Sequence, residues 1–240
     1  MLELINVGFA VEQDGKTKEI LKDISLKFEK GFTAITGPNG GGKSTLAKVV
    51  AGIIKPTSGK ILFNGEDITD LSITERANKG VSFAFQQPVR FKGLTVMDLI
   101  CIAAGKTLSI GQACEYLSEV GLCARDYINR ELNSSLSGGE LKRIEIAMLL
   151  ARSTPLCIFD EPEAGIDLWS FKSLIRVFEK MREKLDGEIL IISHQERILD
   201  IADRVIVLAN GKVEADGTKD EILPTLLNSS RPCPTLVERM

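Results

Sequence analysis

The glycine-rich stretch at 37–45, GPNGGGKST, has the residue types and spacing of a phosphate-binding loop. It follows a short apolar run at 32–36 and precedes the helical pattern TLAKVVAG. Glycines let backbone N–H groups close around phosphate oxygens, and the start of the next helix adds positive potential. In this pattern Lys43 reaches the β- and γ-phosphates and the Ser44 hydroxyl binds Mg²⁺. The predicted nucleotide-binding residues are Gly37, Pro38, Asn39, Gly40, Gly41, Gly42, Lys43, Ser44 and Thr45.

Two acidic residues, Asp160 and Glu161, end a second apolar run at 156–159. Two unpaired carboxylates at the end of a buried strand are costly unless they handle a cation or a proton. Asp160 is therefore a candidate for the Mg²⁺ shell, and Glu161 is a candidate for polarising the attacking water. The alternative is an ordinary helix-capping role for the pair.

Two further polar residues follow apolar runs. His194, the only histidine, comes directly after EILIIS at 188–193, and Gln86 follows another apolar run in FAFQQP. Ligands of open α/β sheets bind at the carboxyl ends of the strands, where such residues gather. There His194 could hydrogen-bond the γ-phosphate and help to hold the water, and Gln86 could reach Mg²⁺ or the water. Either residue, taken alone, could be an ordinary surface side chain.

Residues 135–140, SLSGGE, have the pattern of a second helix start that could bind an anion. Ser137, Gly138 and Gly139 stand just before a periodic apolar run that extends from Leu141 to Ala151. In isolation, this stretch is equally well explained as a capped helix start.

The same sequence predicts the elements that position these residues. The runs at 32–36, 156–159 and 188–193 are typical of parallel strands covered on both faces. Strict alternation at 24–29 indicates a half-buried strand, and Asn-Gly pairs in KILFNGEDI and VIVLANGKVEADG predict hairpins. The region from about 90 to 150 is expected to be mainly helical. We therefore expect an α/β fold, with a RecA-like phosphate-loop NTPase core, an antiparallel β subdomain and a helical subdomain.

The composition limits the classes of partner. The chain has 240 residues, a net charge of -3 and 44% hydrophobic residues, so it has no basic field for nucleic acid. The start of the sequence does not read as a signal peptide, and no apolar run approaches the ~20 residues that span a bilayer. We expect a cytoplasmic protein without direct membrane insertion. Five cysteines without C-x-x-C spacing and a lone histidine offer little to a zinc site.

Together, GPNGGGKST, FQQP, LSGGE, IFDEP, Asp167 after EAGI, and SH at 193–194 resemble the nucleotide-binding domain of ABC ATPases, in that family's order. The resemblance implies one domain over 1–240 that binds ATP and Mg²⁺ and hydrolyses ATP. Its ATP-binding core would cover about 1–87 and 155–217, its helical subdomain about 88–154, and its C-terminal tail about 218–240.

The family resemblance also explains the second helix start, because two such domains pair head to tail. The LSGGE loop of one copy then closes over the γ-phosphate of ATP held by the other. Carried over, Ser137, Gly138 and Gly139 act across the interface of a homodimer, and Asp167 lies at the same seam. Many members stack adenine on an aromatic residue near the N-terminus; the matching position here is Val11, so we expect a weaker, apolar contact with the base.

Within the family, FQQPVRFKGLTV, GGELKR and HQERILD look like the SufC ATPases of iron-sulfur cluster assembly, which favours a soluble SufB-like scaffold as partner. The alternative is the ATP-binding subunit of an ABC membrane transporter, with a membrane subunit as partner. In both cases 87–105 would form the floor of a partner groove beside Gln86. The DNA-repair and chromosome ATPases of the superfamily need long coiled-coil or zinc insertions, which the sequence lacks.

Overall fold

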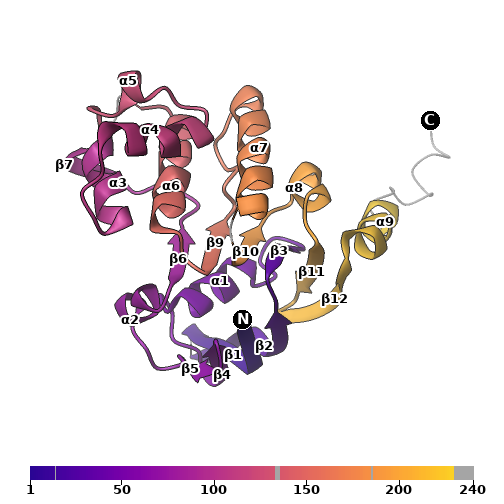
Figure 1. Cartoon of the computed structure of the whole chain (residues 1–240). Helices are drawn as coiled ribbons and strands as arrows, with labels where there is room; N and C mark the ends of the chain where they lie inside the picture. The colour runs from indigo at the N-terminus through magenta and orange to yellow at the C-terminus, as the bar shows by residue number, and fades with distance from the viewer. Residues whose placement is uncertain (14, 133–135, 185, 230–240) are drawn as a thin grey trace, which may run out of the picture.

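The fold was obtained as a computed structural model, which describes residues 1–13, 15–132, 136–184 and 186–229. Its centre is a six-stranded sheet with the strand order β12-β11-β3-β10-β9-β6 (Figure 1). The strands are β3 (Gly31–Thr36), β6 (Val81–Ala84), β9 (Leu156–Asp160), β10 (Glu188–Ile192), β11 (Arg204–Ala209) and β12 (Lys212–Thr218). The three apolar runs predicted as parallel strands are β3, β9 and β10, which pair in parallel and are buried along nearly their whole length. That prediction is confirmed.

A second sheet is antiparallel, with the order β2-β1-β4-β5. Its strands are β1 (Leu2–Gln13), β2 (Lys16–Phe28), β4 (Ser58–Phe63) and β5 (Glu66–Asp67). The predicted alternation is confirmed in β2, where the apolar residues of 24–28 are buried and the residues between them are exposed. Both Asn-Gly pairs form hairpin turns, β4–β5 and β11–β12, and all four residues have φ between 52° and 83°. Two-residue hairpins of this kind require φ above zero at both positions.

The region predicted as mainly helical contains α3 (Val96–Ala104), α4 (Ile110–Glu119), α5 (Ala124–Tyr127) and α6 (Gly138–Arg152). It also contains a small two-stranded sheet, β7 (Phe91–Thr95) with β8 (Glu131–Leu132), which the sequence pattern did not separate from the helices. The N-cap residues of α3, α4 and α6 are Thr95, Ser109 and Ser137. Each forms a capping box that satisfies free backbone N–H groups at the start of its helix. Figure 1 shows this part as a unit at the upper left, opposite the antiparallel sheet.

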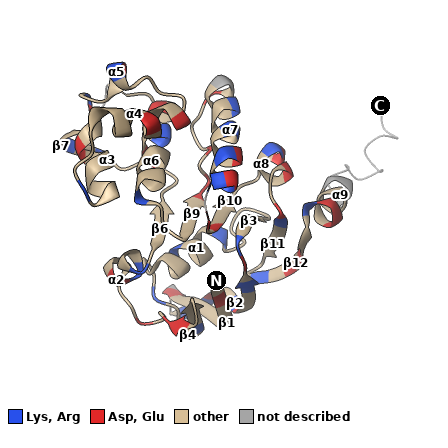
Figure 2. Ribbon diagram, in the orientation of Figure 1, with Lys and Arg blue, Asp and Glu red and all other residues tan. Residues whose placement is uncertain are grey.

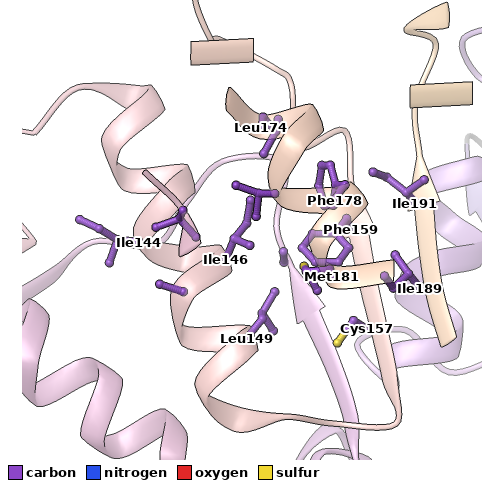
Figure 3. Close-up of a cluster of buried hydrophobic side chains, with 14 of the residues drawn as sticks. Ile144, Ile146, Leu149, Cys157, Phe159, Leu174, Phe178, Met181, Ile189 and Ile191 are labelled. Atoms are coloured by element: carbon purple, nitrogen blue, oxygen red, sulfur yellow. The ribbon is translucent and has the colours of Figure 1, made fainter. Parts of the chain in front are cut away.

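The remaining helices are α1 (Lys43–Ala51), α2 (Ile73–Asn78), α7 (Leu168–Lys184), α8 (Glu196–Asp200) and α9 (Lys219–Ser229). Helices α6 and α7 bury one face of the central sheet, where Phe178 of α7 meets Phe159 of β9 edge to face at 5.0 Å between ring centres (Figure 3). The opposite face packs on α1 and the antiparallel sheet. The central sheet is thus covered on both sides, and this holds the ends of its strands in fixed positions.

The last described helix, α9, occupies part of the segment that the sequence analysis treated as a tail. Pro224 lies within this helix rather than ending it, and Ile222 is buried against the main core. Residues 230–240 lie outside the described residues. Charges of both signs alternate along α7 and α8 (Figure 2). None of the helices in the described ranges has the length and apolar character needed to cross a membrane.

Candidate active site

The glycine-rich stretch forms a loop between the end of β3 and the start of α1. Gly37 has φ 132°, and a Cβ atom there would lie only 2.2 Å from the carbonyl oxygen of Leu208 in β11. Only glycine fits both that backbone conformation and that close approach. The N–H of Gly211, in the β11–β12 turn, donates to the carbonyl oxygen of Gly41 over 3.1 Å. The loop is therefore fixed from behind by the last hairpin of the central sheet.

A cleft of about 500 Å³ opens at this loop. The predicted loop residues from Asn39 to Thr45 line it, together with Lys18, Glu19, Ile20, Lys22, Glu161, Asn210 and Gly211. Val11 does not line the cleft. It pairs across the β1–β2 ladder with Lys18, and Lys18 does line the cleft. The predicted contact of Val11 with the base stays a prediction.

Lys43, the first residue of α1, is buried inside the loop. Its Nζ atom donates to the carbonyl oxygens of Gly37 at 2.8 Å and Pro38 at 2.9 Å. Burial lowers the pKa of the Lys43 ammonium, and the nearby carboxylates of Glu161 and Asp160 oppose that shift. A phosphate would give this ammonium stronger, charge-assisted acceptors than the two carbonyls do.

Ser44 lines the cleft and contacts Asp160 at the end of β9. The Ser44 hydroxyl donates to Oδ1 of Asp160 over 2.8 Å. Asp160 is 3% exposed, and burial raises the pKa of its carboxyl, against the opposing effects of the Ser44 hydrogen bond and the Lys48 charge. A hydroxyl and a carboxylate are hard oxygen ligands of the kind that Mg²⁺ takes beside phosphate. The pair therefore fits an Mg²⁺ ion.

Three predicted residues meet at the carboxylate of Glu161. Gln86 donates through Nε2 to Oε2 of Glu161 over 2.6 Å, and Nε2 of His194 lies 2.8 Å from Oε1. The three side chains follow β6, β9 and β10, whose carboxyl ends meet at one edge of the sheet. Glu161 itself has φ 44°, a left-handed conformation that its backbone N–H supports by donating to Ile192. The predicted contact of Gln86 with Mg²⁺ stays a prediction.

The second helix start lies elsewhere in the chain. Ser137 caps α6 by accepting from the N–H of Glu140, and neither Ser137, Gly138 nor Gly139 lines the phosphate cleft. A Cβ atom on Gly139 would lie 3.8 Å from Oδ2 of Asp167, so these two predicted interface residues are neighbours within one chain. Asp167 also accepts from the N–H of Ser170 at the start of α7. Ser137, Gly138 and Asp167 are exposed, Gly139 is buried, and none of the four lines the chain's own cleft.

A further acidic residue near the site, Glu163, was not predicted from the sequence. Its Oε1 accepts from the Ser193 hydroxyl, and Ser193 in turn accepts from the N–H of Gln195 over 3.0 Å. Burial raises the pKa of the Glu163 carboxyl, whose Oε2 has no hydrogen-bond partner. This pair joins the turn that carries Glu161 to the turn that carries His194. The one available signal was a third acid in the run DEPEAG.

A buried arginine, Arg76 of α2, anchors the far end of the phosphate-loop helix. Its guanidinium donates to the carbonyl oxygens of Val49 at 2.7 Å and Val50 at 2.8 Å, which are at the end of α1. It also donates to those of Thr69 and Leu71. The bonds to Val49 and Val50 supply donors to carbonyl groups in the last turn of α1, where the helix offers few of its own.

Comparisons with known proteins agree with this geometry. The family model described as "ABC transporter" matches residues 21–164. An uncharacterized ABC transporter ATP-binding protein of Methanocaldococcus jannaschii is 40% identical over 214 residues, which cover 85% of each chain. A probable ATP-dependent transporter, ycf16 of Trieres chinensis, is 34% identical over 237 residues, which cover 92% of each.

Among solved structures, the chain is similar to a dimeric ATP-binding cassette in a post-hydrolysis state, bound to ADP and Pi. The TM-score is 0.81 at 26% identity, and the match covers 91% of this chain and 99% of that one. A nucleotide-free cassette from an ABC transporter matches with a TM-score of 0.80, also at 26% identity, over 99% of this chain and 97% of the other. The predicted fold class is confirmed. Because the family model covers more than half of the sequence and its relatives match over most of both lengths, the chain belongs to the ABC transporter ATP-binding family and is an ATP hydrolase.

Proposed function

We propose that the chain is the cytoplasmic ATP-hydrolysing subunit of an ABC transporter complex, which pairs head to tail with a second copy and moves a membrane partner. The observation that carries this proposal is the incomplete site. One chain supplies the phosphate loop, the Ser44–Asp160 pair and the Glu161 carboxylate, whereas its Ser137 loop lies away from the cleft. The similar cassette bound to ADP and Pi is dimeric, which supports the pairing.

The proposed reaction assigns one task to each residue. Lys43 would exchange its carbonyl partners for phosphate oxygens, and Ser44 with Asp160 would hold Mg²⁺. Bound Mg²⁺ supplies positive charge that offsets the charge developing on the phosphates. Glu161 accepts the hydrogen bond of the attacking water.

Gln86 and His194 hold the two oxygens of the Glu161 carboxylate, and so orient it. A carboxylate oxygen can accept two hydrogen bonds, so the attacking water either joins or displaces one of these partners before attack. We assign this change to closure of the second copy over the γ-phosphate. That copy makes the contact through its Ser137, Gly138 and Gly139. Asp167 would lie beside that contact.

Mixing two defective chains tests the shared site. Lys43→Ala removes the phosphate-loop ammonium, and Ser137→Arg blocks the second loop, so either variant alone should be inactive. In a heterodimer of the two, one composite site carries both defects and the other is intact. We expect ATP hydrolysis to reappear on mixing.

The matched control is a chain that carries both changes, mixed with wild type. Each site of that heterodimer has one defect, so activity should fall as the double variant is added. Failure of the two single variants to recover activity at any ratio, while each still folds and wild type hydrolyses ATP, contradicts the shared site.

The partner surface is a groove of about 330 Å³ between the core and the helical subdomain. Apolar side chains from both parts line it. Among them are several of the exposed large hydrophobic residues of the described chain: Ile73, Phe85, Val89, Phe91 and Ile102, which is 64% exposed. The predicted floor at 87–105 thus contributes part of the lining. Arg90 and Lys92 flank Phe91 and are exposed, and Arg152 lines the groove. We propose that a partner helix with an apolar face and acidic residues along its edges binds here.

A second candidate function is iron-sulfur cluster assembly, with a soluble SufB-like scaffold in the same groove. One observation favours it: the stretch FQQPVRFKGLTV, which looks like SufC, supplies Pro88, Val89 and Phe91 to the groove. Purification from native cells separates the two candidates. A complex that needs detergent and contains a polytopic partner supports the transporter, and a detergent-free complex supports the scaffold.

The groove variant Ile102→Asp should lose the partner in either case while keeping its ATP-binding cleft. Exposed Glu179→Gln, on α7, serves as the control that keeps the partner. Retention of the partner by Ile102→Asp contradicts the assignment of the groove.

A further inference from the structure

Both backbone polar groups of Phe85 are bound by side chains of α6. Phe85 lies one residue beyond β6, an edge strand whose pairing with β9 ends at Ala84. Its N–H donates to Oε1 of Glu145 over 3.2 Å, and its carbonyl oxygen accepts from Nζ of Lys142. The same Nζ lies 3.0 Å from Oε2 of Glu145, so the three residues form a closed ring.

This ring is unusual for its burial. Lys142 is 1% exposed, and burial raises the pKa of the Glu145 carboxyl. A buried ion pair is weak evidence for stability, because apolar residues of similar volume often stabilise a fold equally well. Two charges that bind the peptide groups on both sides of Phe85 do, however, fix its position more narrowly than apolar contacts can.

Lys142 and Glu145 thus fix Phe85, the residue just before Gln86. The parallel register of β6 with β9 pairs Ala84 with Phe159, and its continuation brings Gln86 beside Glu161. Gln86 there donates to Glu161 over 2.6 Å. A shift of the Phe85 peptide therefore moves the Gln86 side chain relative to the carboxylate.

We propose that Lys142 and Glu145 are positioning residues for ATP hydrolysis, which hold Phe85 so that Gln86 orients Glu161. This inference rests on the roles proposed above for Gln86 and Glu161. Phe85 and Glu145 also line the partner groove, so a helix bound there contacts the same ring. In the proposed dimer, α6 begins with the loop that contacts the ATP of the second copy, and one rigid helix thus links the groove and both nucleotide sites.

The test is a double-mutant cycle in the full-length protein. Lys142→Met keeps the length of the side chain but removes both of its contacts. We expect kcat to fall about 10- to 100-fold, because misplacement of a group next to the chemistry has costs of that order, with KM for ATP within about threefold of wild type. In a Gln86→Ala background the same change should lower kcat less than about twofold, because the residue through which it acts is already absent.

Lys184→Met is the matched control, since it removes a lysine from an exposed ion pair with Glu119 in the same part of the fold. It should leave kcat unchanged. If Lys142→Met does not fold, as judged by circular dichroism, Glu145→Gln gives the second cycle, because it weakens the ring while keeping an acceptor for the N–H of Phe85.

Equal loss of kcat in the wild-type and Gln86→Ala backgrounds overturns the inference, and so does a loss that appears only in KM. The proposed role of Gln86 is tested separately by Gln86→Ala alone. A wild-type kcat for that variant contradicts the role of Gln86, whereas a reduced kcat with independent effects contradicts only the ring.

Discussion

The Ser44 hydroxyl donates to Oδ1 of Asp160 over 2.8 Å, although 116 positions separate the two residues in sequence. The contact joins the first turn of α1 to the end of β9, which lies two strands away from β3 in the central sheet. It brings a hydroxyl and a carboxylate oxygen together at the end of the sheet. The arrangement supports the proposal that these residues hold Mg²⁺.

Asp160→Asn should weaken the Mg²⁺ site more than the nucleotide site. The amide keeps the shape of the side chain but removes its charge, so we expect the Mg²⁺ concentration for half-maximal hydrolysis to rise at least about 10-fold. Titration of ATPase activity with Mg²⁺ measures this. Asp186→Asn, in an exposed ion pair with Lys30, is the control. An unchanged Mg²⁺ dependence in Asp160→Asn would contradict the assignment.

Glu161→Gln should bind ATP but hydrolyse it about 100-fold or more slowly, because the carboxylate that polarises the attacking water is lost. With ATP and Mg²⁺ it should then accumulate as a dimer, which size-exclusion chromatography detects. A variant that stays monomeric and hydrolyses ATP at the wild-type rate would show that Glu161 does not have this role.

Arg76→Met should destabilise the fold. Arg76 is 1% exposed, and its guanidinium donates to four carbonyl oxygens, which lose these bonds in the variant. We expect the free energy of unfolding to fall by about 2–4 kcal/mol. Urea denaturation measures it, and Lys79→Met, which removes a more exposed ion pair next to α2, should change it far less. A loss below about 1 kcal/mol for Arg76→Met would contradict the anchoring role.

Glu188, at the start of β10, should make stability depend on pH. Its two carboxylate oxygens are buried without partners, and burial raises its pKa from 4.5 to about 8, against the charges of the N-terminus and Arg204. Below pH 4.5 the carboxyl is protonated in both the folded and the unfolded chain. Between 4.5 and 8 only the unfolded chain ionises, so stability falls by about 1.4 kcal/mol per pH unit, and above 8 the loss is complete.

Glu188→Gln removes this titration. From pH 5.5 to pH 8 the variant should therefore lose about 3 kcal/mol less of its unfolding free energy than wild type does. Urea denaturation at the two pH values gives the comparison. The same pH dependence in both proteins would show that Glu188 ionises normally in the folded chain.

The phosphate loop and the Glu161 cluster were predictable because their signals are local. Glycine spacing marks the loop, and an apolar run ending in a polar residue marks Glu161 and His194 at one edge of the sheet. The strands β3, β9 and β10 were predictable for the same reason. Their apolar runs require burial on both faces.

The residues that support the site were not predictable in this way. Lys142, Glu145 and Arg76 are charged, and a charged residue on a helix is normally expected at the surface. Several of their partners are backbone groups 26 to 60 positions away, which no local pattern encodes. The strands β7 and β8 were missed because β7 is exposed or half-buried without alternation and β8 has only two residues.

The contact between Gly211 and Gly41 has a consequence for how the protein is made. The rear wall of the phosphate loop comes from β11 and the turn after it, near the end of the described chain. During synthesis on the ribosome, ATP cannot bind a complete phosphate loop until Leu208 and Gly211 have emerged. Because a ligand stabilises only the form that binds it, the nucleotide can assist the growing polypeptide only after Gly211 has emerged.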